Sequence, residues 1–545
     1  GKKSKLIKNH ANSGDLVLLI GGSTGRDGVG GSQFASDALE GEDRSAVQIP
    51  DPFIEKLIIE AILEARDEKC INAMKDLGGG GLSCAISETA ESLGIGIEID
   101  VQNVHLRESD LSPDEIMISE SQERMLVITS PKKLSKINQI CKKFRIQCSV
   151  IGKVKKDKMM HVTKGKKTLA LLPADFVARG PLIDRLKSKP KYLSKIPNTP
   201  KKNSKKSLSS ILLELLSSPN IASKHWVFRQ YDHEVGIRTT VKPGFDSSVL
   251  RLDNGKSLSI KIDGNPKHCY LNPRDGAIGC FEEACRNVVC TGAKPIGMVD
   301  HLQFGSPEDP EIFWTFMESI EGITDYAKAM NIPCVGGKVS FYNETNDGPI
   351  KPTPLIGVLG LIEKSPLLPK PPTKNDVLLL VGETKDELGG SEYYEYIHDF
   401  IGGSVPKVSI NVSKRNMHSV LSLISKKLVT NVHDCSKGGL SCAISEICIS
   451  GKIGCNVNLK NVSHMSPEKS LFSESHSRYL LVVKKKKLED VQKLLSKNKC
   501  HFSQIGIFIG DQIIFKFAKQ TILKLRVDKA ENLYLNSLEK IIHNG

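Results

Sequence analysis

Three features that mark well-known protein classes are missing from this sequence. None of its 14 cysteines forms a CxxC pair, so a zinc ribbon, a zinc finger or a thioredoxin-type site is not expected. No uninterrupted apolar run approaches ~18 residues, so neither a transmembrane helix nor a membrane partner is expected. The first residues carry no apolar core of a signal peptide. We therefore expect a cytoplasmic protein with reduced thiols.

Aromatic residues are also scarce, at 5% of the sequence, whereas basic residues are in excess. The 76 Lys and Arg residues outnumber the 62 Asp and Glu residues, which gives a net charge of +14. Proteins that bind nucleic acid pair a basic patch with aromatic residues or with a groove-reading motif, and neither is found. Solvated lysines or an anionic small substrate explain the charge, and a nucleic-acid partner is not expected.

The chain contains an internal repeat. The nine residues GGLSCAISE occur at 80–88 and again at 438–446, which chance does not produce. In both copies an apolar strand-like run precedes this motif and helix-like segments alternate with further strands, so each copy is predicted to be an α/β domain. Shorter matches flank the motif at 15–21 and 376–382, and at 119–122 and 473–476.

The repeat sets the predicted domain organisation. Two copies of one C-type domain, at 1–175 and 370–530, flank a β-rich segment at 226–365 that occurs once and that we call the N-type domain. If an N-type domain precedes each C-type domain, another of ~150 residues is expected before residue 1. A Lys-rich linker is predicted at 176–225, either as a solvated connector or as a dock for an acidic partner, and a C-terminal tail at 531–545.

Local signals in the first copy predict a helix and a glycine loop. Asp51 suits a helix N-cap and Pro52 the first helical position, with Phe53 opening an apolar stripe that continues to Ile62. The segment 24–32 is rich in glycine and contains an Arg, which is typical either of a phosphate-binding loop or of a tight turn. It matches neither GxGxxG nor GxxxxGK[ST], so a Rossmann fingerprint or a P-loop is not supported.

Comparison of the copies indicates which one holds a ligand. We align Gln48 with Ser409 and Gln122 with His476, so two amide side chains that can hydrogen-bond a polar ligand are present only in the first copy. Surface drift is the alternative. Asp76 is retained as Asp434 and stands beside four glycines, where it could hold Mg²⁺ or cap the following helix.

The N-type segment offers two weaker signals. Asp300 follows an apolar run, and a glycine turn with a hydroxyl, Gly337 to Ser340, follows another. An acid at a strand end together with such a turn fits a nucleotide and metal site.

These motifs resemble the phosphoribosylformylglycinamidine (FGAM) synthase family, in its small PurL form. The matching stretches are GDLVLLIGGSTGRDGVGGSQFAS, VQIPDPFIEKL, KDLGGGGL, ISESQERMLV, RNVVCTGAKPIGMVDHLQFGSPEDPEIFW and GGKVSFYNE. The resemblance covers nearly the whole chain except the Lys-rich linker. It implies tandem modules of the PurM, or aminoimidazole ribonucleotide (AIR) synthetase, superfamily, with the catalytic histidine in the expected first N-type domain. No catalytic residue is therefore assigned within this chain.

The resemblance also implies a reaction, the ATP-dependent amidation of formylglycinamide ribonucleotide (FGAR) to FGAM in purine biosynthesis. ATP phosphorylates the amide oxygen, and ammonia then displaces phosphate. Residues carried over by position are the substrate contacts Gln48, Glu120, Ser121, Gln122 and Ser340, the ATP contacts Asp300 and Gly337, and the Mg²⁺ ligand Asp76.

One position departs from the family. Lys338 stands where the family has an Asn that ligates metal, and an ammonium group cannot ligate a cation. Either Lys338 contacts phosphate itself or that ion is absent.

Two kinds of partner follow from the resemblance. A separate glutaminase subunit, PurQ, is expected to supply ammonia, and a small subunit, PurS, to bridge the complex. Two alternative functions stay open: another ATP-dependent synthetase or kinase of the same superfamily, and a non-catalytic scaffold.

Overall fold

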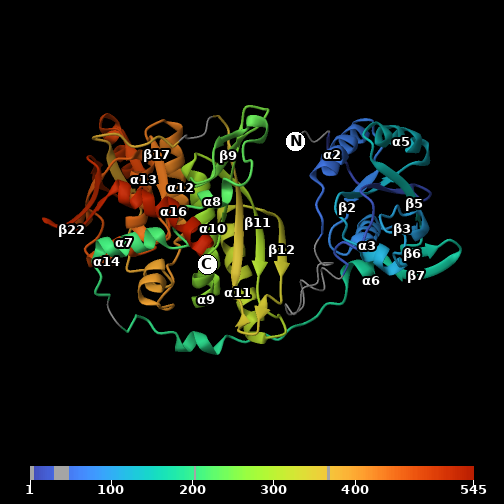
Figure 1. Cartoon of the computed structure of the whole chain (residues 1–545), viewed down its shortest axis with the longest axis horizontal. Coiled ribbons are helices and arrows are strands. Elements are labelled where there is room, and N and C mark those ends of the chain that lie inside the picture. Colours follow the sequence, from blue (N-terminus) through green and yellow to red (C-terminus); the bar gives the residue numbers. More distant parts are fainter. Residues whose placement is uncertain (1–4, 30–47, 202–203, 365–368, 545) are drawn as a thin grey trace. The chain divides into compact units, whose positions relative to one another are not determined.

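The internal repeat is present as two seven-stranded sheets with the same strand order. The computed structural model describes residues 5–29, 48–201, 204–364 and 369–544, and the chain forms two compact units, residues 1–184 and 185–545 (Figure 1). The sheet of the first unit has the order β2-β4-β1-β5-β3-β6-β7. Its strands are β1 Leu16–Gly21, β2 Ala73–Asp76, β3 Gly96–Asp100, β4 Arg124–Thr129, β5 Gln147–Lys155, β6 Met159–Lys164 and β7 Lys167–Pro173.

The second copy lies in the second unit, with the order β17-β19-β16-β20-β18-β21-β22. Element by element this is the order of the first sheet, so the mixed α/β fold predicted from the repeat is confirmed. Its strands are β16 Val377–Val381, β17 Asn431–Asp434, β18 Cys455–Asn458, β19 Tyr479–Val483, β20 Phe502–Phe508, β21 Gln512–Phe517 and β22 Gln520–Arg526.

Helices cover both faces of the first sheet. On one face α2 (Pro52–Asp67) and α5 (Leu134–Lys143) bury their apolar residues against β1 and β4. On the other face lie α3 (Gly81–Leu93), α4 (Pro113–Ile118) and α6 (Ala174–Arg179). The predicted helix after Asp51 is confirmed with that residue as its N-cap, but Phe53 is 71% exposed and does not belong to the buried stripe.

Backbone geometry accounts for the two glycines of the repeated motif. Gly80 and Gly438 precede α3 and α13 (Gly439–Gly451) with φ of +75° and +73°, a conformation that L side chains rarely adopt. A Cβ on Gly81 would lie 2.1 Å from the carbonyl oxygen of Ser119, so only a glycine fits at this position. The motif is therefore required by the turn that joins a strand to its helix.

The helices that follow β1 and β16 correct one alignment. Helix α12 (Ile410–Ser425) has the same length as α2, and both end at the same distance from β17 and β2. Its N-cap, Ser409, therefore corresponds to Asp51 rather than to Gln48. The alignment of Gln48 with Ser409 was wrong because a three-residue similarity, VQI and VSI, is displaced from the helix register.

The N-type segment forms a six-stranded sheet in the second unit, with the order β12-β11-β15-β10-β9-β8. Figure 1 shows α10 (Pro273–Cys290) and α11 (Pro310–Met330) beside this sheet. Almost every residue of α10 is buried, because the helix also contacts α12 and β17 of the second copy. The strands are β8 Thr239–Val241, β9 Ser248–Arg251, β10 Ser257–Asp263, β11 Lys294–Gln303, β12 Cys334–Ser340 and β15 Thr353–Ile362, with α9 at Pro266–Leu271 and a small hairpin of β13 Glu344–Thr345 and β14 Gly348–Pro349.

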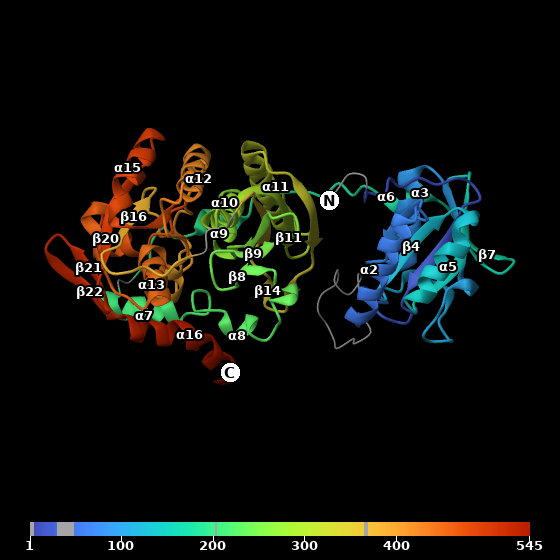
Figure 2. The same ribbon diagram turned by 90° about the horizontal axis from the view of Figure 1, so that it is seen from above.

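The segments predicted as a linker and as a C-terminal tail both contain helical residues. Within the predicted linker, α7 (Leu208–Ser217) buries Ile211, Leu212, Leu215 and Leu216, a helical spacing that the surrounding Ser and Lys residues hide in the sequence. The predicted tail belongs to α16 (Val527–Asn544), which lies along α7 (Figure 2). The remaining helices are α8 His225–Phe228, α14 Pro467–Phe472 and α15 Leu488–Lys497.

The basic part of the linker is attached to the second unit. Tyr192 stacks on Tyr270 with ring centroids 4.5 Å apart, and its hydroxyl donates to the Tyr270 carbonyl at 3.0 Å. Arg185 pairs with Glu308, and the Pro197 carbonyl accepts a bond from Gly403. These contacts hold the segment against the unit.

All 14 cysteines are free thiols. Among the helices that the structure describes, none combines the length and the hydropathy that crossing a membrane requires.

Candidate functional site

The candidate site of the first copy centres on Glu120. This side chain is 4% exposed, and one carboxylate oxygen accepts a 2.6 Å hydrogen bond from Gln48 Nε2. The other oxygen accepts a 3.0 Å bond from the backbone N–H of Gly80. The structure thus joins two of the predicted substrate contacts, which are 72 residues apart in the chain, at the turn that starts α3.

The neighbours of Glu120 have different surroundings. Ser121 is buried, and its hydroxyl donates to Asp27 and accepts a 2.9 Å bond from the N–H of Gly25. That hydroxyl therefore holds the glycine loop. Gln122 is half-buried, and its Nε2 donates to the Glu120 carbonyl at 3.2 Å, which leaves its amide oxygen available.

Asp76 ends β2 and is exposed. Helix α3 starts at Gly81 with Gly80 as its N-cap, so the alternative that Asp76 caps this helix is wrong. Within the described residues its carboxylate forms neither an ion pair nor a hydrogen bond. It offers a single hard oxygen donor group of the kind that Mg²⁺ prefers.

The glycine loop is fixed by ion pairs rather than left open to an anion. Arg26 contacts three carboxylates, those of Glu108, Asp110 and Glu115, at 2.9–3.0 Å. Its charge is therefore matched within the protein, which favours the tight turn over the phosphate-binding loop for residues 24–29. The rest of the predicted loop, Gly30 to Ser32, lies outside the described residues.

A buried arginine fixes the same frame in both copies. Arg124 donates to the carbonyls of Ser119 and Ser121 and to the Thr24 hydroxyl at 2.6–2.9 Å. Burial lowers the pKa of Arg124 to about 10. In the second copy Arg478 makes the same three bonds at 2.7–3.0 Å, to Ser473, Ser475 and Thr384. Neither arginine was predicted as a site residue, although each follows the matching Ser-Glu-Ser triplet of its copy with two residues between.

The predicted ATP contacts of the N-type domain are neighbours across two strands. Asp300 on β11 faces Gly337 on β12, where a Cβ would lie 2.3 Å from the Asp300 carboxylate. Only a glycine leaves room for that carboxylate, whose pKa is raised by burial. Ser340 ends β12, and its hydroxyl lies 3.2 Å from the Asn343 amide nitrogen, while the neighbouring Lys338 is exposed.

A polar cavity of about 380 Å³ lies in the second unit, where the N-type domain meets the second copy. Asp246, His433 and Asp434 bring one ligand atom each within 4.8 Å of one another there, and they form the single candidate metal-binding group found among the described residues. His433 Nδ1 lies 2.9 Å from Asp246. Asp434 is the counterpart of Asp76, and its retention was the one sequence signal for this cavity.

Charges around this cavity compensate one another. Burial opposes ionisation of Asp434, but Arg286 lowers its pKa to about 2. Burial raises the pKa of Asp263 to about 7. Burial also disfavours the charged form of His433, yet Asp246 raises the pKa of this histidine. Asp246, Asp434 and His433 offer carboxylate oxygens and an imidazole nitrogen, donor types that bind divalent metals once the histidine is neutral.

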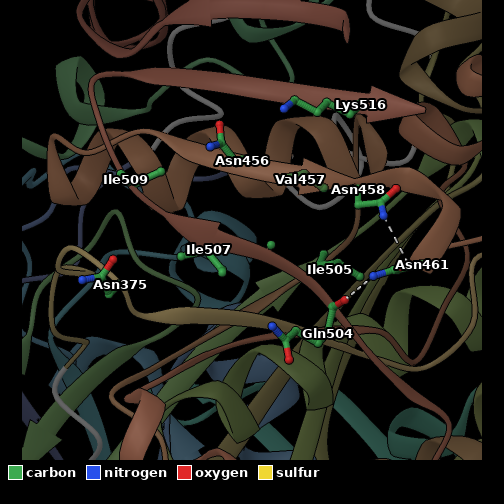
Figure 3. A pocket seen from close by; sticks show the side chains of 11 residues that line it. Asn375, Asn456, Val457, Asn458, Asn461, Gln504, Ile505, Ile507, Ile509 and Lys516 are labelled. Atoms are coloured by element: carbon green, nitrogen blue, oxygen red, sulfur yellow. Dashed lines mark hydrogen bonds between the residues drawn. The ribbon is translucent and has the colours of Figure 1, made fainter. Parts of the chain in front are cut away.

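Another hollow of the second copy contains none of the predicted residues. It lies between β18, β20 and β21 and has a volume of about 400 Å³. Figure 3 shows Asn461 between Asn458 and Gln504, held by a 3.4 Å bond from the Asn458 amide and by its own 2.9 Å bond to the Gln504 carbonyl. Uncharged amide and isoleucine side chains make up most of its lining.

The comparisons with known proteins agree with this architecture. The family model for the C-terminal domain of AIR synthase related proteins matches residues 12–165 and 373–517, and the model for the N-terminal domain matches residues 244–362. The PurL subunit of phosphoribosylformylglycinamidine synthase from Pyrococcus horikoshii is 43% identical, over 99% of this chain and 76% of the relative. This chain belongs to the PurL family.

Other PurL proteins agree. The PurL subunit of Alkaliphilus metalliredigens is 39% identical over 97% of the chain and 73% of the relative. The match to the solved structure of Thermotoga maritima PurL complexed with FGAR covers 93% of this chain and 74% of the chain in that structure. Its TM-score is 0.69 at 24% sequence identity. The PurLQS structure from the same organism has a TM-score of 0.67 at 23% identity and covers 94% of the chain and 74% of its own. These two structures show the shared fold.

Proposed function

We propose that this PurL-family chain catalyses the ATP-dependent conversion of FGAR to FGAM. The observation that carries the proposal is the similarity to PurL subunits along 99% of the chain. In the reaction, the amide oxygen of FGAR attacks the γ-phosphorus of ATP and ADP leaves. Ammonia then adds to the activated carbon, phosphate departs, and the amidine forms.

The first copy is proposed to hold FGAR. Gln48 and Gln122 present amide groups beside the buried Glu120, which orients Gln48 through their 2.6 Å bond. Such fixed donors and acceptors can place the FGAR amide in line with the γ-phosphoryl group. Ser121 acts through the loop that it holds, and Ser340 of the N-type domain is proposed as a further substrate contact.

ATP is proposed to bind at Asp300 and Gly337. Because Gly337 lacks a Cβ, the Asp300 carboxylate and the adjacent backbone can approach a ligand from the same strand edge. Lys338 then lies where its ammonium can contact a phosphate. No catalytic residue is assigned within the described chain.

Asp76 of the first copy is proposed to contribute one ligand to Mg²⁺. Asp76 supplies an exposed carboxylate oxygen, and Gly78 beside it leaves room for water or phosphate oxygens to complete the shell. When bound, Mg²⁺ would neutralise phosphate charge as it builds on ATP.

A glutaminase subunit, PurQ, and a small subunit, PurS, are proposed as partners that supply and channel ammonia. The support is the PurLQS assembly named for the Thermotoga maritima relative. We propose a cytoplasmic location, where the 14 free thiols would stay reduced.

The proposal is tested by measuring FGAR-dependent ADP release and FGAM formation with Mg²⁺ and excess ammonium. The chain is assayed alone, then with the N-type domain that the resemblance implies, and then with PurQ, PurS and glutamine in place of ammonium. We expect ADP and FGAM in equal amounts under at least one of these conditions. FGAR-independent ATP turnover would favour another superfamily kinase, and silence with every partner shown to bind would favour a scaffold.

A further inference from the structure

The second copy contains a small cationic pocket at the start of α12. Its volume is about 230 Å³, and its wall includes Ser409, Arg415 and His476. The pocket lies in the second unit, and its lining contains no residue assigned to the proposed reaction. Nothing in that reaction accounts for its charge.

Arg415 is the most informative residue of this pocket. Among the described residues its guanidinium forms no ion pair, and its Nε is buried without a hydrogen-bond partner. The buried Nε is therefore a hydrogen-bond donor that no described residue uses, on a side chain that carries a positive charge. A ligand that accepts a hydrogen bond and carries negative charge would satisfy it.

The N-terminus of α12 points to the same ligand. No side chain accepts a hydrogen bond from its first N–H groups, and its first turn contains no acid. In the first copy the corresponding helix α2 is closed by Asp51, which accepts bonds from the N–H groups of Phe53 and Ile54 at 3.1 and 3.0 Å. Because free N–H groups and the helix dipole attract negative charge, the uncapped end favours an anion.

The rest of the wall is basic and polar. Lys385 and Lys407 contribute ammonium groups, and the Lys407 ammonium lies 3.7 Å from the Asp275 carboxylate. Glu383 is the single acid of the lining. His476 is 9% exposed, and its ring lies against α10, with Nδ1 3.5 Å from the Glu282 carboxylate. Counted over the lining, Lys385, Lys407 and Arg415 outnumber the single acid, so the pocket has a net positive charge.

The matching pocket of the first copy has a different chemistry. Its wall includes Phe53, Ile54 and Leu57 of α2, whereas its cations, Lys143 and Arg145, lie at and just after the C-terminal end of α5. In helix register Leu57 is the counterpart of Arg415, so the cation on the helix wall of the pocket is found in the second copy and not in the first.

We propose that this pocket binds a phosphate dianion, either free inorganic phosphate or the phosphate of a small monoester. The anion would accept hydrogen bonds from the first N–H groups of α12, from the Ser409 hydroxyl and from the Arg415 guanidinium, a charge-assisted arrangement. The pocket has room for a phosphate and a small attached group.

The test is a titration of the full chain with inorganic phosphate, and separately with ribose 5-phosphate, followed by calorimetry and by ³¹P line broadening. Arg415→Leu introduces the residue of the first copy, and the matched control Lys414→Leu removes an equal charge from the same helix outside the pocket. We expect saturable binding that Arg415→Leu weakens at least 10-fold and Lys414→Leu less than 2-fold. Tighter binding of ribose 5-phosphate would identify a monoester as the ligand, and equal or weaker binding would identify free phosphate.

Ser409→Asp separates binding from folding. The new carboxylate caps α12 and so preserves the helix, but it occupies the place of the anion and should abolish the Arg415-dependent binding. Phosphate that binds at the proposed substrate site of the first copy should be unaffected by these variants. It would appear in the calorimetry as a second bound phosphate per chain. Absence of saturable binding in the wild type, or equal losses in Arg415→Leu and Lys414→Leu, would overturn the proposal.

Discussion

The two copies share a hydrogen-bond frame but differ in the surfaces built on it. Arg124 and Arg478 donate hydrogen bonds to corresponding groups of the two copies, namely two serine carbonyls and one threonine hydroxyl in each. Around that frame the first copy has a pocket whose helix wall is apolar, together with the hydrogen-bonded pair of Gln48 and Glu120. The second copy has a pocket with Arg415 on its helix wall. Duplication has thus kept the part that orders the loops and changed the parts that meet ligands.

Strands β3 and β5 differ in the same way from their counterparts β18 and β20. In the first copy Glu98 pairs with Lys153 and Lys155 at 3.0 Å. At the matching positions the second copy has Asn456, Ile507 and Ile509, which line the uncharged hollow of Figure 3. An exposed ion pair contributes little to stability, so its loss costs the fold little and leaves this surface open to change.

The largest effect is expected where the copies agree. Replacing either buried arginine by Met, Arg124→Met or Arg478→Met, removes three hydrogen bonds and leaves buried carbonyls unpaired. We expect the free energy of unfolding of the affected unit to fall by about 3–5 kcal/mol. Hydrogen exchange during urea unfolding, read on peptides of each copy, measures the two units separately.

Arg179→Met is the control for this pair. Arg179 is an exposed arginine paired with Glu91, and its replacement should change the unfolding free energy by less than ~1 kcal/mol. If Arg124→Met lowers the unfolding free energy no more than the control does, while Arg478→Met lowers it by several kcal/mol, the arginine hydrogen bonds stabilise only the second copy. That result would contradict the inference that both copies depend on the same frame.

The next largest effect is expected on FGAR binding, because only the first copy is proposed to hold this substrate. Gln48→Ala removes the amide that Glu120 orients, and we expect FGAR binding and kcat/KM to fall by roughly 10–100-fold, the range for a hydrogen bond in a charged setting. The control Glu474→Gln changes the counterpart of Glu120 in the second copy and should alter kcat/KM less than 3-fold. Both are measured by calorimetry with FGAR and by ADP release. A larger effect of Glu474→Gln than of Gln48→Ala would place the substrate in the second copy.

Much of this comparison follows from the sequence, because the nine identical residues encode a turn that tolerates only glycine. Other parts did not follow. Gln48 was paired with Ser409 on a three-residue similarity that the helix register overrides. The approach of Asp246 to His433 depends on the packing of the N-type domain against the second copy, 187 residues apart in the chain. No local pattern encodes a contact of that kind.

A pH effect is expected from Glu474, the buried glutamate of the second copy. Burial, and then the neighbouring Glu392, raise the pKa of Glu474 from its usual 4.5 to about 7. The folded state thus keeps a proton that the unfolded chain has released above pH 4.5. Stability of the second unit should therefore fall as pH rises from about 4.5 to 7, and level off above that.

Glu474→Gln mimics the protonated carboxyl and keeps an oxygen for the N–H groups of Glu392 and Gly438. Its unfolding free energy should equal that of the wild type at pH 4, below the pKa in the unfolded chain, and exceed it at pH 8 by roughly 1–3 kcal/mol. Denaturant unfolding at the two pH values measures the difference. Parallel pH profiles for wild type and variant would show that Glu474 stays ionised in the fold.

The smallest effect exchanges the two helix caps. Asp51→Ser weakens the acceptor for two N–H groups at the start of α2, and Ser409→Asp adds one to α12, so the expected changes in unfolding free energy have opposite signs and sizes of about 1 kcal/mol or less. Thermal unfolding in phosphate-free buffer measures both. Added phosphate should then stabilise wild type more than Ser409→Asp, because the carboxylate and the anion compete for one helix end. If phosphate stabilises both chains equally, the open end of α12 reflects a missing cap and nothing more.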